Sequence, residues 1–271
     1  MPFTLIKGEF VPEAGRPDGD SMRFRPENPT PLFMLKRRGH APKINQSNGT
    51  IQLRFEGIDT MESKAAAPFS SDATKSNLEL CGVPDGTGTA PGYILTNQIG
   101  PNGRPIAFVY AGTTTESDGA SIFLEADRLK ESINYEQLEI GHAYPLFYDT
   151  LFFSLRQELS KATKKARQTN QNVWSNDSTN SGTLYSGSES LKTMPPIFPK
   201  LWRRLDKYSR DTDTLDTNSL GEFKEYMESI REERVFIISE SKATGFDDII
   251  QVSGNTVNLQ YLPEDIVVVS V

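Results

Sequence analysis

The chain has 271 residues and a formal net charge of −7, and 36% of its residues are hydrophobic. That length is sufficient to bury a core without disulfide or metal cross-links. The single cysteine, Cys81, excludes an internal disulfide, and two widely separated histidines, His40 and His142, argue against a zinc site built from His and Cys.

The first part of the chain is typical of a strand-rich barrel. Apolar runs and apolar–polar alternation predict five strands, over residues 3–11, 21–25, 50–57, 92–100 and 103–112. Residues 27–49 are rich in Pro, Asn and Gly and are predicted to form an inserted loop. A Ser/Asp start and a closing Gly82 predict a short helix at 70–82.

The rest of the chain is predicted to be mainly helical before a smaller mixed unit. The pattern predicts helices over residues 120–133, 135–144, 149–169, 195–208 and 220–233, and strands over 234–239 and 261–271. We therefore expect an α+β fold. Its parts are a five-stranded, OB-fold-like β-barrel with packed helices (1–175), a Ser/Gly-rich linker (176–190) and a small C-terminal domain of mixed helices and strands (191–271).

The charge is unevenly distributed. Residues 1–175 hold 19 basic and 20 acidic side chains, whereas residues 176–271 hold 10 and 16. Attraction to nucleic acid would depend on local patches such as 35–43 and 161–167, each of which is equally consistent with solvated surface. The start of the chain lacks the features of a signal peptide and no window approaches 18 apolar residues, so we expect a soluble, cytoplasmic protein with no membrane partner.

Two acidic residues lie at the start of the second strand. Asp20 shares a strand face with Met22 and Phe24, so its carboxylate is expected to point toward the core and to need a partner. Asp18 precedes it by two residues. The alternative is an Asp-Gly turn in which both acids accept hydrogen bonds from loop amides.

Residues 51–63 combine an arginine with several acids. Arg54 lies on the strand face opposite Leu53 and Phe55, and Gly57 lets the chain turn before Asp59. Oxygens from Asp20, Asp59 and a nearby carbonyl would suit a hard cation such as Ca²⁺. A strand-end ion pair between Arg54 and one of the acids remains the alternative.

A second arginine, Arg104, starts the fifth predicted strand in phase with Ile106 and Phe108. An arginine on an apolar face needs a carboxylate or a phosphate, for which its planar guanidinium is suited. A structural salt bridge would satisfy the same requirement.

Together these segments resemble the staphylococcal nuclease-like (thermonuclease) family over about residues 3–175. The resemblance depends on four ordered segments: the first strands with an Asp-Gly-Asp turn (18–20), an Arg-x-x-x-x-Asp-Thr-x-Glu segment (54–62), a second-arginine strand (103–112) and a closing Trp-Ser (174–175). It implies a nuclease that requires Ca²⁺ and hydrolyses DNA or RNA with low sequence specificity.

The resemblance also implies a metal site. The carboxylates of Asp20 and Asp59 and the backbone carbonyl of Thr60 would bind Ca²⁺, and Asp18 would lie beside these ligands. Lengthening of the interval between Asp20 and Arg54 by about twenty residues departs from the family pattern.

For catalysis the resemblance implies that Glu62 activates the attacking water and that Arg54 and Arg104 hold the phosphate. Met61 stands where the family usually carries a proline, so the placement of Glu62 is a specific question for the structure.

The alternative function is a catalytically silent OB-fold module that binds nucleic acid or protein. Inactive relatives are expected to lose acids or arginines, whereas this chain retains all five charged positions of the proposed site. For the C-terminal domain we expect either a protein partner or regulation of the catalytic domain in cis.

Overall fold

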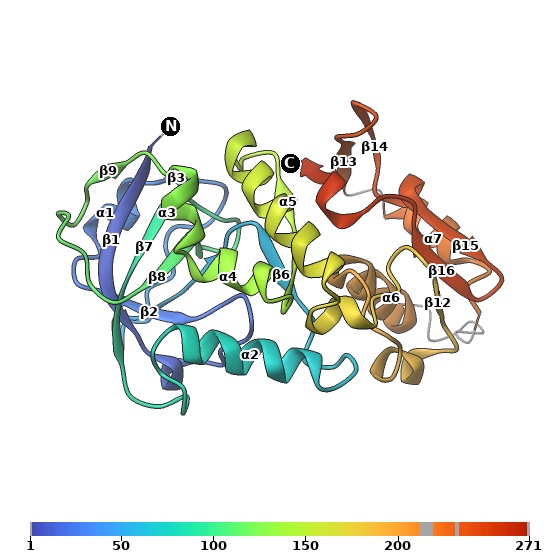
Figure 1. The fold of residues 1–271 in the computed structure, drawn as a ribbon, viewed down its shortest axis with the longest axis horizontal. Coiled ribbons are helices and arrows are strands. Elements are labelled where there is room, and N and C mark those ends of the chain that lie inside the picture. Colours follow the sequence, from blue (N-terminus) through green and yellow to red (C-terminus); the bar gives the residue numbers. More distant parts are fainter. Residues whose placement is uncertain (1, 212–218, 231–232, 270–271) are drawn as a thin grey trace.

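The computed structural model describes residues 2–211, 219–230 and 233–269 and has a mixed α+β fold. A barrel-like sheet lies at one end of the molecule and the C-terminal strands lie at the other, with helix α5 (Phe153–Gln168) between them (Figure 1). Seven α-helices occur in the described ranges, and none of them is both long and apolar enough to cross a membrane. The expected α+β class is confirmed.

The main sheet closes almost completely on itself. Its strand order is β4-β2-β1-β7-β8-β5. The bounds are β1 Phe3–Phe10, β2 Arg23–Pro26, β4 Ile51–Gln52, β5 Arg54–Phe55, β7 Ala90–Ile99 and β8 Pro105–Ala111. Strands β4 and β5 belong to one extended segment that pairs with β2 on one side and with β8 on the other. The two ends of the strand order are therefore joined, and the five predicted strands are all present.

The barrel is filled by the alternating apolar residues that predicted its strands. Buried aromatic rings dominate this core: Phe3, Phe10, Phe24, Phe55 and Phe108. Edge-to-face contact between Phe3 and Phe108, with ring centroids 5.7 Å apart, is one example. This packing fixes which face of each strand points outward to the site.

Three helices besides α5 pack on the barrel: α2 Phe69–Leu80, α3 Ala126–Lys130 and α4 Ile133–Glu139. In α4 the buried Asn134 donates to the carbonyls of Glu56 and Ala107 and accepts from the Val109 amide. This side chain joins α4 to β8 and to the segment that follows β5.

Two of the predicted helices include residues that form strands. Residues 120–133 contain strand β9 (Ser121–Ile122) before α3, because Phe3 and Thr4 of β1 offer an edge for pairing. Residues 135–144 end in strand β10 (Ala143–Pro145), after the left-handed Gly141 (φ 77°) ends the helical segment.

The predicted inserted loop, 27–49, is partly ordered into regular elements. It contains helix α1 (Thr30–Met34) and strand β3 (Lys36–Arg37). Strand β3 pairs in parallel with β7, with Lys36 opposite Gln98. The segment thus adds a short strand to the barrel sheet, which sequence alternation over two residues could not indicate.

The C-terminal half contains two small sheets and two helices. One sheet has the order β11-β17-β13-β14 and the other β12-β16-β15. Their bounds are β11 Phe147–Tyr148, β17 Ile266–Val269, β13 Arg234–Ile237, β14 Lys242–Gly245, β12 Thr183–Leu184, β16 Thr256–Leu259 and β15 Ile250–Ser253. The helices α6 (Pro199–Asp211) and α7 (Phe223–Ser229) overlap the helices predicted over 195–208 and 220–233, and α7 is shorter than predicted. Residues 231–232 and 270–271 lie outside the described residues.

Both halves of the chain contribute to a second core. Met61 and Tyr144 from the first half pack in one cluster with Phe198, Leu201 and other C-terminal residues. Strand β11 pairs with β17 across the same junction.

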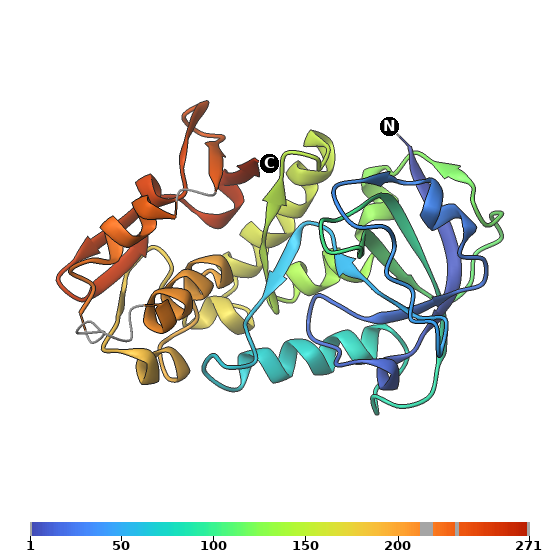
Figure 2. The same cartoon turned by 180° about the vertical axis from the view of Figure 1, so that it is seen from behind.

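Residues 176–190, expected to be a linker, include β12 and the fully buried Tyr185. Strand β6 (Ile58–Thr60) pairs with β10. In Figure 2, β6 lies between the barrel and the C-terminal half, which contains α6.

Candidate active site

Three chain segments meet at the edge of the barrel: the loop before β2, residues 54–62 and the start of β8. Burial opposes the charge of Arg54, but Asp20 and Asp59 outweigh it and raise the pKa of the guanidinium above its ordinary value. The Phe55 amide donates to the Asp20 carbonyl at 2.9 Å, which places the acidic loop beside the strand that carries Arg54. Arg54 also lines one groove with Arg203, whose guanidinium binds Asp59. The structure therefore brings together Asp20, Arg54 and Asp59, which lie in separate parts of the sequence.

The loop that carries Asp18 and Asp20 is held by amide side chains from two helices. Asn77 of α2 donates to the carbonyls of Asp18 (2.6 Å) and Ser21 (3.2 Å). Gln137 of α4 donates to the carbonyl of Gly19 (2.9 Å). Both amide side chains are fully buried. The sequence analysis did not identify Asn77 and Gln137. The pattern that could have identified them is a polar residue on the apolar face of a predicted helix.

Asp20 is a buried carboxylic acid with unusual electrostatics. Burial and then the neighbouring Asp18 raise its pKa well above the ordinary value, while Arg54 acts in the opposite direction. Its backbone is fixed, since the carbonyl accepts from the Phe55 amide at 2.9 Å. A cation close to Asp20 would stabilise its ionised form.

Arg104 lies beside Arg54. Burial and then repulsion from Arg54 lower the pKa of Arg104, and Asp20 and Asp18 only partly offset this. Two guanidinium groups held this close favour an anion between them, and phosphate can accept from both. The two predicted arginines are thus neighbours, as their proposed role requires.

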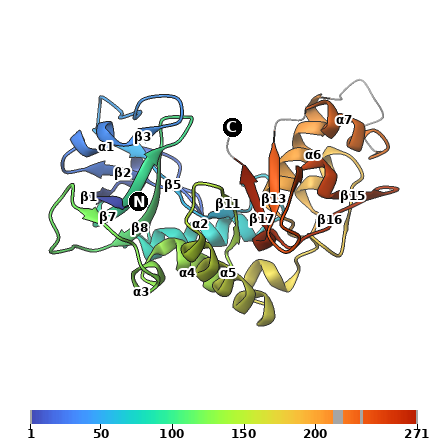
Figure 3. The same cartoon turned by 90° about the horizontal axis from the view of Figure 1, so that it is seen from above.

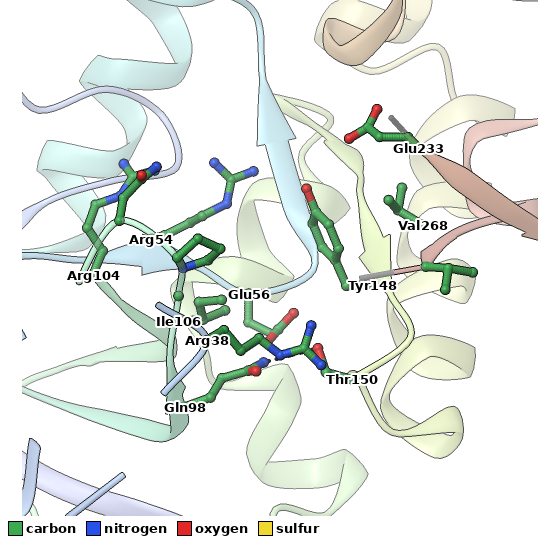
Figure 4. Close-up of a pocket in the computed structure, with 14 residues that line it drawn as sticks. Arg38, Arg54, Glu56, Gln98, Arg104, Ile106, Tyr148, Thr150, Glu233 and Val268 are labelled. Carbon is green, nitrogen blue, oxygen red and sulfur yellow. Dashed lines mark hydrogen bonds between the residues drawn. The ribbon is translucent and has the colours of Figure 1, made fainter. Parts of the chain in front are cut away.

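A pocket of about 370 Å³ opens beside these arginines. Figure 4 shows Arg54 and Arg104 on one side, Tyr148 in the middle and Glu233 of the C-terminal half across from them. Burial raises the pKa of the Tyr148 phenol, so it stays neutral and can donate a hydrogen bond. The pocket therefore presents cationic and neutral donors to an incoming ligand.

Glu56 is a further acid in this pocket that sequence reasoning did not select. It is 4% exposed, and burial raises its pKa to about 7, with Arg54 acting in the opposite direction. Its amide donates to the Ala107 carbonyl, which fixes the turn at Gly57. A carboxyl that titrates near neutrality makes the charge of this pocket sensitive to pH.

Asp59 and Glu62 are both bound by an arginine from the other half of the chain. Arg203 of α6 donates to the two carboxylate oxygens of Asp59 at 3.1 and 2.7 Å, and to Oε1 of Glu62 at 2.8 Å. Asp59 is buried and the Glu62 side chain is 36% exposed. Burial opposes the charge of Arg203, but the two acids raise its pKa above the ordinary value.

Met61 fixes the backbone between these acids. Its side chain is 3% exposed and belongs to the second core, with Tyr144 and Trp174 among its members. Where the family that the sequence resembles usually carries a rigid proline, this chain therefore has a methionine whose side chain is anchored in the core. Glu62 follows directly, which places its carboxylate at the edge facing α6.

The proposed metal site offers oxygen atoms, which are the ligands that a hard cation such as Ca²⁺ binds. Among the described residues, no group of three or more His, Cys, Asp and Glu side chains is arranged to hold a metal. Asp20 and Asp59 nevertheless offer two carboxylates beside the backbone of the buried Thr60. Calcium accepts carboxylate, carbonyl and water oxygens together, so these donors are of the right chemical kind, but Arg203 already occupies both carboxylate oxygens of Asp59.

The chain was compared with models of known protein families and with curated proteins. No family model matches it, and no curated protein matches it significantly.

Proposed function

We propose that the protein is a phosphodiesterase that hydrolyses DNA or RNA with low sequence specificity and requires Ca²⁺. The strongest support is that Asp20, Arg54 and Asp59 lie together, with Arg104 beside them. These residues come from separate segments, and Asp20 and Arg104 are 84 positions apart in the sequence. These are the residues to which the resemblance to the staphylococcal nuclease-like family assigned roles. We extend the proposal to an OB-fold-like topology for the barrel and to residues 1–175 as the catalytic part.

In the proposed reaction, a water oxygen attacks phosphorus while the bond from phosphorus to the leaving oxygen breaks. Glu62 accepts a proton from this water, a role that contributes about 10²- to 10⁴-fold in rate. Arg54 and Arg104 donate to the phosphoryl oxygens, where loss of one donor costs about 3 to 4 kcal/mol of transition-state stabilisation.

The resident metal would be held by Asp20, Asp59 and the Thr60 carbonyl. When bound, Ca²⁺ supplies positive charge that polarises the phosphoryl group. Arg203 must leave Asp59 for this ligand set to form, because the guanidinium occupies both oxygens of that carboxylate. Release of Arg203 also frees Glu62 to act as the base.

The test is digestion of labelled single-stranded DNA, duplex DNA and RNA under a Ca²⁺ titration. Glu62→Ala and Arg54→Ala are expected to lose most of the cleavage while keeping the far-UV circular dichroism of the parent protein. Cleavage by either variant at the parent rate would contradict the proposal.

A second candidate is a binding module without catalysis, and one observation favours it. Arg203 occupies the proposed base and a proposed metal ligand at once, so the site as folded is closed to both roles. Tight binding of nucleic acid or protein without cleavage, across a series of divalent metals, would support this candidate.

A further inference from the structure

A second groove runs along α6 and opens beside the candidate active site. It has a volume of about 600 Å³, and its lining includes Arg54, Glu62 and Tyr148. Arg54 and Tyr148 also line the first pocket. The groove is therefore a continuation of the site toward the C-terminal half, where Figure 3 places α6 beside α7.

The groove is basic although the chain as a whole is acidic. Among the described residues that line it, three are acidic, namely Glu62, Asp206 and Glu233. Six basic residues besides Arg54 line it: Lys64, Lys200, Arg203, Arg204, Lys207 and Arg210. Seven cations against three anions give this surface a formal charge of +4 in a chain of net −7.

Helix α6 produces this charge by its periodicity. Five of the ten basic residues in 176–271 lie on α6, at spacings of three and four that place them along one side. Leu201, Leu205 and Tyr208 on the other side are buried in the second core. The helix therefore presents a row of cations to the groove from a fixed backbone.

These cations have two kinds of environment. Lys200 and Arg204 are held by Glu233, with 2.6 Å between Lys200 Nζ and the carboxylate, and their side chains are largely buried. Lys207 and Arg210 are more exposed, at 35% and 64% of the side chain, and within the described part of the chain each forms an ion pair with an acid one turn away on α6. Exposed pairs of this kind are worth about 1 kcal/mol or less, so a ligand can replace them.

We propose that this groove binds the sugar–phosphate backbone of the nucleic-acid strand whose phosphodiester is held at Arg54. The inference rests on the proposed function, because it takes a nucleic acid as the ligand. From Lys200 to Arg210 the helix rises about 15 Å, the length of roughly four nucleotides at 3.4 Å each. An extended polyanion matches a row of cations of this length, whereas one free phosphate would not.

The test measures binding where cleavage cannot occur. Fluorescence anisotropy of a labelled single-stranded DNA 16-mer is recorded in EDTA at several salt concentrations, with single-stranded RNA and duplex DNA as separate arms. The triple variant Lys64→Ala/Lys207→Ala/Arg210→Ala is compared with the control variant Lys75→Ala/Lys130→Ala/Lys192→Ala, which removes the same charge from exposed positions outside the groove and outside both basic patches of the sequence.

Loss of three phosphate contacts is expected to reduce the slope of log K against log salt by about 2 for a single strand. The groove variant should therefore bind at least tenfold more weakly at 0.1 M salt. The control variant should retain the parent slope, and Lys64→Arg/Lys207→Arg/Arg210→Lys should restore binding. Thermal melts of all three variants report whether the fold is kept.

Equal salt slopes for the groove and control variants would overturn the inference, as would a parent protein that does not bind the DNA at all. Displacement of the DNA by poly-glutamate as readily as by a second oligonucleotide would assign the groove to an acidic protein instead. Because binding is measured in EDTA, the outcomes are separable. A slope change without cleavage under any metal would refute hydrolysis alone, and cleavage without a slope change would refute the groove alone.

Discussion

Arg203 and Asp59, 144 residues apart in the sequence, form a two-bond ion pair with nitrogen–oxygen distances of 3.1 and 2.7 Å. Asp59 lies in the barrel half and Arg203 on α6, so the pair joins the candidate metal site to the C-terminal half. The same guanidinium binds Glu62. An internal cation therefore already neutralises the acids that the proposed mechanism needs free.

Arg203→Ala is expected to increase the affinity for Ca²⁺. A hydrogen bond to a charged group contributes about 1.5 to 3 kcal/mol, so removing the competing guanidinium should strengthen binding roughly tenfold or more. Isothermal titration calorimetry measures this directly. Arg128→Ala is the matched control, because Arg128 makes a similar two-bond pair with Glu116. Unchanged or weaker Ca²⁺ binding by Arg203→Ala would contradict the competition.

This variant is also a better probe of the C-terminal half than truncation at residue 175. Truncation would remove β17, the partner of β11, and would expose Met61 and Tyr144 of the second core. Loss of activity after truncation could then reflect unfolding alone. Arg203→Ala removes the bonds to Asp59 and Glu62 and leaves the apolar side chains of this core in place.

Met61→Ala is expected to lower the free energy of unfolding by about 2 to 5 kcal/mol, the usual cost of emptying a buried methionine site. The side chain is 3% exposed in the core shared by both halves. Urea unfolding measures the change, and Met61→Leu, which nearly conserves volume, should cost less than about 1.5 kcal/mol. Equal stability of Met61→Ala and the parent protein would show that this contact does not hold the halves together.

Gln137→Leu is expected to destabilise the protein by about 1 to 3 kcal/mol and to weaken Ca²⁺ binding. The buried amide donates to the Gly19 carbonyl and accepts from the Ser76 hydroxyl, and leucine would remove the partner of both groups. Gly19 lies between Asp18 and Asp20, so loss of the bond loosens the acidic loop. Gln168→Leu, at an exposed position on α5, is the control. A destabilised variant with parent affinity for Ca²⁺ would separate the loop from the metal site.

The barrel could be predicted because alternation is a local property of the sequence. Residues such as Leu53 and Phe55 are buried on one face, as their spacing indicates. The meeting of Asp20 with Asp59 required the resemblance, since no local pattern relates two loops of a barrel. Strand β9 was missed because its conformation depends on an edge of β1 that only the folded sheet provides.

Arg203 could not have been identified from its sequence. It lies in a basic helix whose charges are equally consistent with a solvated surface, and its partners follow from how the two halves pack. The short strands β12, β14, β15 and β16 were missed for a related reason. They are two to four residues long and are held by pairing rather than by periodicity.

Glu56 is expected to make stability fall as the pH rises. Burial raises its pKa from 4.5 to about 7 in the folded state. Between these values the unfolded chain has lost the proton while the folded protein keeps it, so the unfolded state binds fewer protons and is favoured by increasing pH. The loss begins near pH 4.5 and is complete above pH 7. Between pH 5 and pH 8 it amounts to roughly 2 to 3 kcal/mol.

Glu56→Gln cannot titrate, so the comparison isolates this one group from all others that ionise over the same range. Urea unfolding of the parent and the variant at pH 5 and pH 8 gives the difference. The parent should lose roughly 2 to 3 kcal/mol more than Glu56→Gln on going to pH 8. Glu136→Gln on α4 serves as a control, because that side chain is exposed. Parallel pH profiles for the parent and Glu56→Gln would mean that the pKa of Glu56 has its ordinary value in the folded protein. That result would require either water or a cation in the pocket beside Arg54.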